Sequence, residues 1–184
     1  MIIDLRGVEF SGRILDIGGG GEGVVARYWA ACGNNSGDVV VIDNRADELE
    51  ESPDFGIKII MDARKLMFLD NSFDNITCFF SLMYMDEQTK SQFLDEAYRV
   101  LKPNGVLWLW DTSISEVSLK EIFIVNLDII LTDQQRISTG YGVTWNKSQS
   151  SESISALCAN AGFSIVTNTL NEQCFFIKAI KKEV

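Results

Sequence analysis

The 184-residue sequence contains no histidine, only two prolines, and four cysteines that never occur as a CxxC pair. Protein zinc sites mostly use closely spaced cysteine and histidine ligands, so a zinc site of this kind is excluded and we expect no metal site. Catalysis through histidine is excluded as well. Most of the cysteines lie in apolar stretches, and we interpret them as free thiols, which favours a reducing, cytoplasmic location.

Basic residues are also scarce in this chain. Sixteen lysines and arginines stand against 26 aspartates and glutamates, which gives a formal net charge of −10. Such a charge repels the phosphate backbone of nucleic acids, and no basic stripe interrupts it. We therefore expect no nucleic-acid partner, while neutral or cationic small molecules and protein partners remain open.

Long apolar runs are missing too. No stretch of about 20 residues is free of charged side chains, so we expect no membrane-spanning helix. The segment MIIDLRGVEF at the start of the sequence lacks the basic region and apolar core of a signal peptide. Apolar residues make up 46% of the sequence, and we expect residues 1–184 to form one domain with one sizeable core.

Short apolar runs alternate with helical patterns, which predicts βαβ units and a parallel sheet. The apolar runs predict strands at 13–17, 39–42, 57–61, 75–80 and 106–110. Helices are expected at 22–31, 46–51, 86–101 and from the serines at 150–153 to residue 161. The last two strands, 164–169 and 174–179, pair as an antiparallel hairpin. The predicted fold is α/β, a doubly wound, mostly parallel seven-stranded sheet with this C-terminal hairpin and with helices on both faces.

Residues 115–131 carry apolar side chains on most sides, and we predict a helix there. Such a helix can belong to the core, form a lid or make the contact of a homodimer. In the polar stretch 132–149, Gly140 and Gly142 flank Tyr141. Glycines beside aromatic residues are typical of mobile lids, although a plain surface loop fits equally well. We expect residues 112–149 to cover the substrate side of the domain.

A glycine-rich segment, Gly18-Gly-Gly-Gly-Glu-Gly23, follows the first predicted strand. Glycines let the backbone turn sharply and approach a ligand closely, and the following helix N-terminus offers free N–H groups to an anion. The spacing also fits GxGxxG, with Asp43 twenty residues after Gly23, as in an NAD fingerprint. The motif alone therefore leaves open NAD, S-adenosylmethionine (SAM) and a tight turn without a ligand.

Asp16 and the length of the chain favour SAM. A carboxylate beside the glycines can hold the ammonium group of SAM, whereas it would repel the pyrophosphate of NAD. In addition, 184 residues leave no room for a separate dehydrogenase substrate domain.

Two further segments resemble a known family. Residues 61–74, MDARKLMFLDNSFD, resemble the adenine-binding and fourth-strand segment of class I SAM-dependent methyltransferases. Residues 96–105, EAYRVLKPNG, resemble the family's connection from a helix to the fifth strand, with Asn104 where glycine is usual. The resemblance covers residues 12–111 in detail and the C-terminal hairpin more loosely. It implies a methyltransferase that uses SAM to methylate a small-molecule acceptor and releases S-adenosylhomocysteine.

The resemblance also implies roles for the residues that would hold the methionine and ribose parts of SAM. Asp16 and the backbone at Gly18 and Gly20 would hold the methionine part. Asp43 would accept hydrogen bonds from both ribose hydroxyls, since a carboxylate is an acceptor only. Asn44 would border the adenine.

Residues after the third and fourth strands would complete the cofactor site. Asp62 would accept a hydrogen bond from the adenine amino group, with the Ala63 backbone beside it. Asp62 can at the same time cap a short helix over residues 63–66. Ser81 and Leu82 would face the methyl donor.

Methyl transfer is a displacement at a sulfonium methyl group, so the protein mainly supplies alignment and a dry pocket. A base is needed only where the acceptor must lose a proton. Tyr84, Asp111 and Tyr141 are our candidates for this base or for substrate anchors, with Asp128 a weaker choice. Many members of the family carry a histidine near residues 81–85, and this sequence has none there.

Two departures from the family leave other functions open. The histidine is missing, and only about twelve residues precede the first predicted strand, where many relatives have a helix that closes over SAM. We therefore expect a pocket that is more open or is completed by a partner chain. The second hypothesis is a SAM-binding module that is not catalytic or is assembled with a partner, and the third is a small NAD-binding protein.

Overall fold

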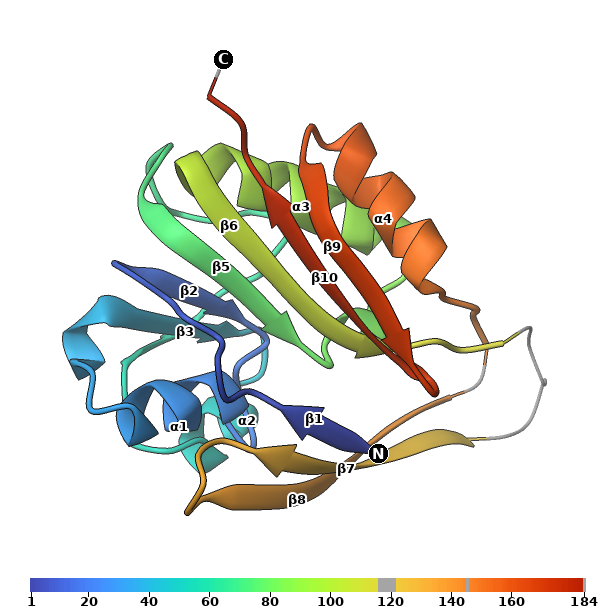
Figure 1. Cartoon of the computed structure of the whole chain (residues 1–184). Helices are drawn as coiled ribbons and strands as arrows, with labels where there is room; N and C mark the ends of the chain where they lie inside the picture. Colours follow the sequence, from blue (N-terminus) through green and yellow to red (C-terminus); the bar gives the residue numbers. More distant parts are fainter. Residues whose placement is uncertain (116–121, 145, 184) are drawn as a thin grey trace.

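A large mixed sheet forms the centre of the computed structural model, which describes residues 1–115, 122–144 and 146–183 (Figure 1). Its strands are β2 (Ile14–Ile17), β3 (Val39–Asp43), β4 (Ile57–Ile60), β5 (Phe73–Phe79), β6 (Leu101–Thr112), β9 (Ser164–Asn171) and β10 (Cys174–Ile180). They lie in the order β4-β3-β2-β5-β6-β10-β9. All neighbours from β4 to β6 are parallel, while β10 is antiparallel to both β6 and β9. The predicted seven-stranded sheet with its C-terminal hairpin is confirmed.

Helices lie on both faces of this sheet, as predicted (Figure 1). The helices are α1 (Val24–Ala31), α2 (Ala46–Glu51), α3 (Glu87–Val100) and α4 (Ser151–Asn160), with short 3-10 helices η1 (Ser36–Asp38) and η2 (Leu82–Tyr84). Successive residues of β6 point to opposite faces. Leu107 and Leu109 pack in the core under α3 and α4, whereas Trp108 and Trp110 belong to the core under α1.

A second, three-stranded sheet covers part of the α1 face (Figure 1). It consists of β1 (Ile2–Asp4), β7 (Ile122–Ile130) and β8 (Arg136–Thr144), in the order β1-β7-β8. The prediction of a helix over 115–131 is wrong for residues 122–130, and residues 116–121 lie outside the described residues. The stretch 132–149, expected to be a lid or a loop, contains β8 instead.

The alternation of side chains explains why β7 is a strand. From Ile122 to Ile129 the even-numbered residues are exposed and the odd-numbered ones are buried, which is the period of two of a strand. The polar residues Asn126 and Asp128 both fall on the exposed face. Isoleucine and valine also favour strands. The helix prediction followed the apolar content of the segment and gave this alternation too little weight.

Most other predicted elements are found within a few residues of their expected bounds, and β6 begins earlier than expected. Its first residue, Leu101, directly follows α3, and Asn104 has a φ of +62°. Asparagine tolerates this left-handed conformation better than most residues, which explains how it replaces the usual glycine.

All four cysteines are free thiols, three of them buried. Among the described residues, no helix is long and apolar enough to cross a membrane.

Candidate functional site

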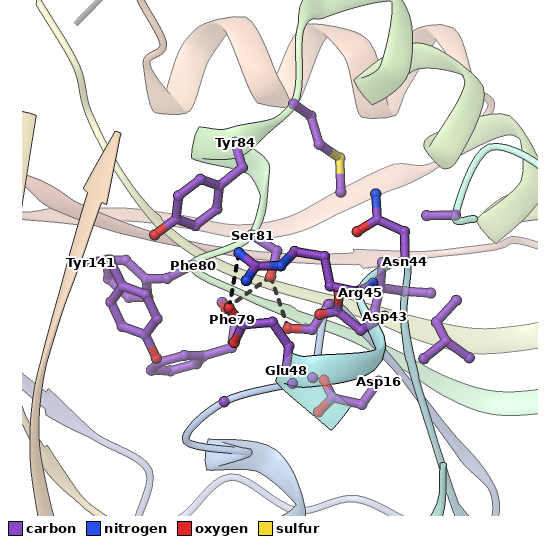
Figure 2. Close-up of a pocket in the computed structure, with 18 of the residues that line it drawn as sticks. Asp16, Asp43, Asn44, Arg45, Glu48, Phe79, Phe80, Ser81, Tyr84 and Tyr141 are labelled. Atoms are coloured by element: carbon purple, nitrogen blue, oxygen red, sulfur yellow. Dashed lines mark hydrogen bonds and ion pairs between the residues drawn. The ribbon is translucent and has the colours of Figure 1, made fainter. Parts of the chain in front are cut away.

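A cavity of about 1050 Å³ lies at the carboxyl ends of the parallel strands. The chain runs outward in both directions from β2 and β5, and ligands bind in α/β sheets at this kind of switch point. Its volume is at the upper end of the range for small-molecule pockets. Figure 2 shows Asp43 and Asn44 on one side of it and Tyr84 and Tyr141 on the other. We call the side with Asp16, residues 18–21 and Asp43 the glycine-loop end, and the side with Tyr84 and Tyr141 the tyrosine end.

The glycine-rich loop is held in place by its own backbone. The N–H groups of Gly18 and Gly19 donate to the Ile42 carbonyl at 2.8 and 3.2 Å, and Gly21 N–H donates to the Glu48 carbonyl at 2.8 Å. Gly18 has a φ of +65°, and a Cβ atom there would collide with the Ser81 side chain. Only glycine fits at this position, and the loop backbone stays close to the cavity.

Asp16 lies at the end of β2, almost fully buried, and lines the cavity. The Thr77 hydroxyl donates to Asp16 Oδ1 at 2.7 Å. The pKa of Asp16 is raised to about 7, mainly by burial and to a smaller extent by the charge of nearby Asp43, while the hydrogen bond from Thr77 lowers it. A cation beside Asp16 would favour the ionised carboxylate, so this position suits a positively charged ligand group.

Asp43, Asn44, Asp62 and Ala63 all line the cavity, as expected. Asp43 Oδ1 accepts a hydrogen bond from the Arg45 N–H at 3.0 Å, and Oδ2 lies against Gly20. Asp43 Oδ2 therefore faces the loop from the end of β3.

The carboxylate of Asp62 is held by Arg64. The two side chains form an ion pair with an N–O distance of 2.6 Å, and the hydrogen bond from Arg64 keeps the pKa of Asp62 below its usual value. The short helix expected after Asp62 does not form. Instead, the Arg64 N–H donates to Asp62 Oδ1 and the Lys65 N–H donates to the Asp62 carbonyl, which closes a turn.

Ser81 and Leu82 have different surroundings. Ser81 lines the cavity and its hydroxyl donates to the Gly18 carbonyl at 3.1 Å, so it joins the loop after β5 to the glycine-rich loop. Leu82 is fully buried in the core under α3 and does not line the cavity. The expectation that Leu82 faces the methyl donor is wrong, because η2 turns its side chain into that core.

Tyr84 and Tyr141 line the cavity from η2 and β8. The ring of Tyr141 stacks on Phe80, with centroids 5.3 Å apart and planes at 15°. Burial raises the pKa of both tyrosines, while a backbone hydrogen bond from Gly142 partly offsets this at Tyr84. Both phenols therefore stay protonated at neutral pH, which suits anchors better than bases.

Asp111 does not line the cavity and is completely buried. Its carboxylate accepts hydrogen bonds from the N–H groups of Met83 at 3.2 Å and Thr112 at 2.8 Å, and from Gln149 Nε2 at 2.7 Å. Burial raises the pKa of Asp111 to about 6. The expectation that Asp111 contacts substrate is wrong, because these bonds use the carboxylate to join η2 to the segment before α4.

Asp128, the weaker candidate, lies on β7 away from this cavity. Its Oδ1 accepts a hydrogen bond from the Ser138 hydroxyl at 2.6 Å.

Phe80 and Glu22 line the cavity although neither was predicted there. Phe80 has a φ of +50°, an uncommon conformation for a bulky residue, and it lines the cavity directly after β5. The helix expected at 22–31 begins only at Val24, after its N-cap Gly23, so Glu22 precedes the helix and lines the cavity. The exact start of a helix after four glycines could not be located from residue type.

The comparisons with known proteins agree with this geometry. A family model described as "Methyltransferase domain" matches residues 15–109. The ubiquinone/menaquinone biosynthesis C-methyltransferase UbiE of Pseudomonas paraeruginosa is 35% identical over 126 residues, which are 64% of this chain and 48% of that protein. The chain thus spans about half the length of the curated relatives it matches.

Solved structures share the fold. A SAM-dependent methyltransferase from Mesorhizobium loti has a TM-score of 0.67 and 17% identity, with 96% of this chain and 95% of that chain covered. A SAM-dependent methyltransferase from Aquifex aeolicus has a TM-score of 0.65 and 19% identity, with 96% and 86% covered. Because the family model matches more than half of the residues, the chain belongs to the methyltransferase domain family, and it has the same fold as these two SAM-dependent methyltransferases.

Proposed function

We propose that this chain binds SAM in the cavity and transfers its methyl group to a small-molecule acceptor, releasing S-adenosylhomocysteine. The main support for this proposal is the chemistry of the glycine-loop end. There, the buried carboxylate of Asp16 has no basic partner among the described residues and lies beside the backbone of the glycine-rich loop. SAM carries an ammonium and a sulfonium, and both positive charges suit this end of the cavity.

In this proposal, Asp16 and the backbone of Gly18 and Gly20 bind the methionine part of SAM. Asp43 accepts hydrogen bonds from the ribose hydroxyls, and Asn44 borders the adenine. Their common position at the ends of β2 and β3 supports these roles.

Asp62, Ala63 and Ser81 complete the proposed cofactor site. Both oxygens of Asp62 accept two hydrogen bonds from Arg64, so Asp62 accepts from the adenine amino group when the exposed Arg64 side chain turns away and frees Oδ2. Ala63 lies beside the adenine. Ser81 lies near the methyl group, where its bond to Gly18 fixes the spacing between the two loops.

The acceptor occupies the tyrosine end, with Tyr84 and Tyr141 as its anchors. β8 contributes residues 139–142 to the cavity wall, and Asn146 and Lys147 follow. These positions support the view that residues 112–149 cover the substrate side of a single domain over residues 1–184. The four free cysteines support a cytoplasmic location.

One observation favours a second candidate, a SAM-binding module with little activity alone. Both tyrosines at the tyrosine end have raised pKa values, and Asp111 lies outside the cavity. An acceptor that must lose a proton would find no base among these three residues.

Incubation with SAM labelled in its methyl group and a panel of small acceptors, followed by mass spectrometry, tests the two candidates. Label transfer to any acceptor, with release of S-adenosylhomocysteine, supports the enzyme. Tight SAM binding without transfer to any acceptor supports the module. Preferential binding of NAD contradicts both.

A further inference from the structure

The tyrosine end presents two aromatic rings. Tyr141 stacks on Phe80, and the Tyr84 hydroxyl lies near the Gly142 backbone. Tyr84 is half exposed, and both rings line the cavity from different elements, as Figure 2 shows. Tyrosine rings in this arrangement can offer their faces to a ligand at little entropic cost.

Glu22 supplies an uncompensated negative charge near these rings. Its side chain is half-buried and lines the same cavity. Within the described parts of the chain, no lysine or arginine lies within ion-pair distance of its carboxylate. Glu22 is the charged group that acts most strongly on the Tyr141 hydroxyl, followed by Tyr84 and then by the carboxylates of Asp16 and Asp111.

The basic side chains on the cavity are engaged elsewhere. Arg45 pairs with Asp47 and Glu48, and Arg64 pairs with Asp62. Arg27 is exposed, so solvent screens its charge, and its Nε donates to the Glu22 carbonyl at 2.6 Å.

The ammonium group of Lys147 could bind an anionic ligand at this end of the cavity, but it already has other partners. Its Nζ donates to the Met85 carbonyl at 3.2 Å, and the carboxylates of Asp86 and Asp111 act on it. Two negative charges therefore already face Lys147. Glu22 thus keeps a negative charge near Tyr141 that no ion pair among the described residues compensates.

We propose that the tyrosine end recognises an organic cation, a protonated or quaternary amine carried by the acceptor. Tyr84 and Tyr141 would offer their ring faces and Glu22 the opposing charge. Cations bind over aromatic rings, most strongly where water is excluded, and a nearby carboxylate adds to the attraction. This inference rests on the proposed function, because it names the substrate class of the same cavity.

Three probes with the same ring and different charges test this inference. 2-Phenylethylamine is a cation at neutral pH, 3-phenylpropionate is an anion, and 3-phenylpropan-1-ol is neutral. Each is titrated calorimetrically into the full chain saturated with S-adenosylhomocysteine. The expected result is that the amine binds roughly tenfold more tightly than the alcohol, and that the acid binds most weakly.

Variants assign the preference to particular residues. Glu22→Gln should lower the affinity for the amine roughly tenfold and leave that for the alcohol unchanged. Tyr84→Leu should lower the affinity for the amine by a similar factor. Tyr84→Phe keeps the ring face and should retain this affinity. In all variants the affinity for S-adenosylhomocysteine should stay within about twofold of the wild type, which shows that the protein is folded.

Binding of the acid as tightly as the amine would overturn the inference and point to Lys147 instead. So would an unchanged affinity for the amine in Glu22→Gln, or the loss of S-adenosylhomocysteine binding in that variant, which would place Glu22 at the cofactor. If S-adenosylhomocysteine binds but none of the probes does, the inference fails and the proposed function stands. If S-adenosylhomocysteine does not bind to the wild type, both fail.

Discussion

The two ends of the cavity are built in different ways. At the glycine-loop end, Asp16, Asp43 and Asp62 each lie at or just after the end of a parallel strand, and the loop is one short segment. At the tyrosine end, Tyr84 and Tyr141 come from different elements, and β8 belongs to a separate sheet. Motifs that follow one strand can be recognised in the sequence, whereas a wall assembled from distant segments exists only in the fold.

The two ends also differ in chemistry. The glycine-loop end offers backbone groups and carboxylates, which suit a polar, cationic cofactor. The tyrosine end offers aromatic rings, which suit a ligand group with an apolar or cationic face. The following experiments separate these contributions, and the largest expected effect comes first.

The second sheet carries Tyr141 at the tyrosine end, and its central strand β7 can be tested with two substitutions. Leu127 is buried and Ile124 is exposed on the opposite face of the strand. Leu127→Ala should lower the free energy of unfolding by about 2–5 kcal/mol, and Ile124→Ala by at most about 1 kcal/mol. Chemical denaturation measures both. In a helix, residues 124 and 127 would share a face, so similar losses in the two variants would contradict the strand.

The glycine-rich loop can be tested with a matched pair of alanines. Gly18 and Gly33 both have a positive φ, but only at Gly18 would a Cβ atom collide, with Ser81. Gly33→Ala should cost about 1–2 kcal/mol of stability from backbone strain alone. Gly18→Ala should cost about 1–3 kcal/mol more from the collision, and should also weaken SAM binding. Equal losses and normal SAM binding in both variants would show that the loop does not approach the cofactor.

The ionisation of Asp16 predicts that the affinity of the glycine-loop end for SAM depends on pH. In the free protein its pKa is raised to about 7 by burial, so below that pH the carboxyl is protonated. Binding of a cation then requires the release of this proton, and SAM affinity should fall up to about tenfold for each pH unit below about 7. Above that pH, the contribution of Asp16 is fully present.

Calorimetry in buffers of different ionisation enthalpy measures both the affinity and the proton release. Asp16→Asn should bind SAM more weakly, by about 1.5–3 kcal/mol near neutral pH, and should lose this pH dependence. If the affinity of Asp16→Asn for SAM depends on pH as steeply as that of the wild type, the proton released on binding comes from another group.

The parallel core of the fold could be predicted because each of its strands is a compact apolar run between helical patterns. The region 112–149 could not, since its exposed isoleucines made β7 look apolar on all sides. Ile122 and Ile124 face outward, where apolar side chains are tolerated.

The same contrast separates the site residues that were placed correctly from those that were not. Asp16 and Asp43 were predicted because the resemblance to the methyltransferase family assigns both to SAM, and they lie at the ends of the adjacent parallel strands β2 and β3. Leu82 and Asp111 were misplaced because the direction of a side chain beyond a strand depends on the local turn. η2 turns Leu82 into the core, and the N–H groups of Met83 and Thr112 bind Asp111 there. Residue type and spacing do not contain this information.

The most direct test of the account is a calorimetric titration of the wild type and Asp43→Ala with SAM, S-adenosylhomocysteine and NAD. We expect micromolar binding of both adenosyl ligands and none of NAD. In Asp43→Ala, the loss of the ribose hydrogen bonds should reduce the binding free energy of both adenosyl ligands by about 1.5–3 kcal/mol. Preferential binding of NAD, or unchanged SAM affinity in a folded Asp43→Ala variant, would contradict the proposed cofactor site.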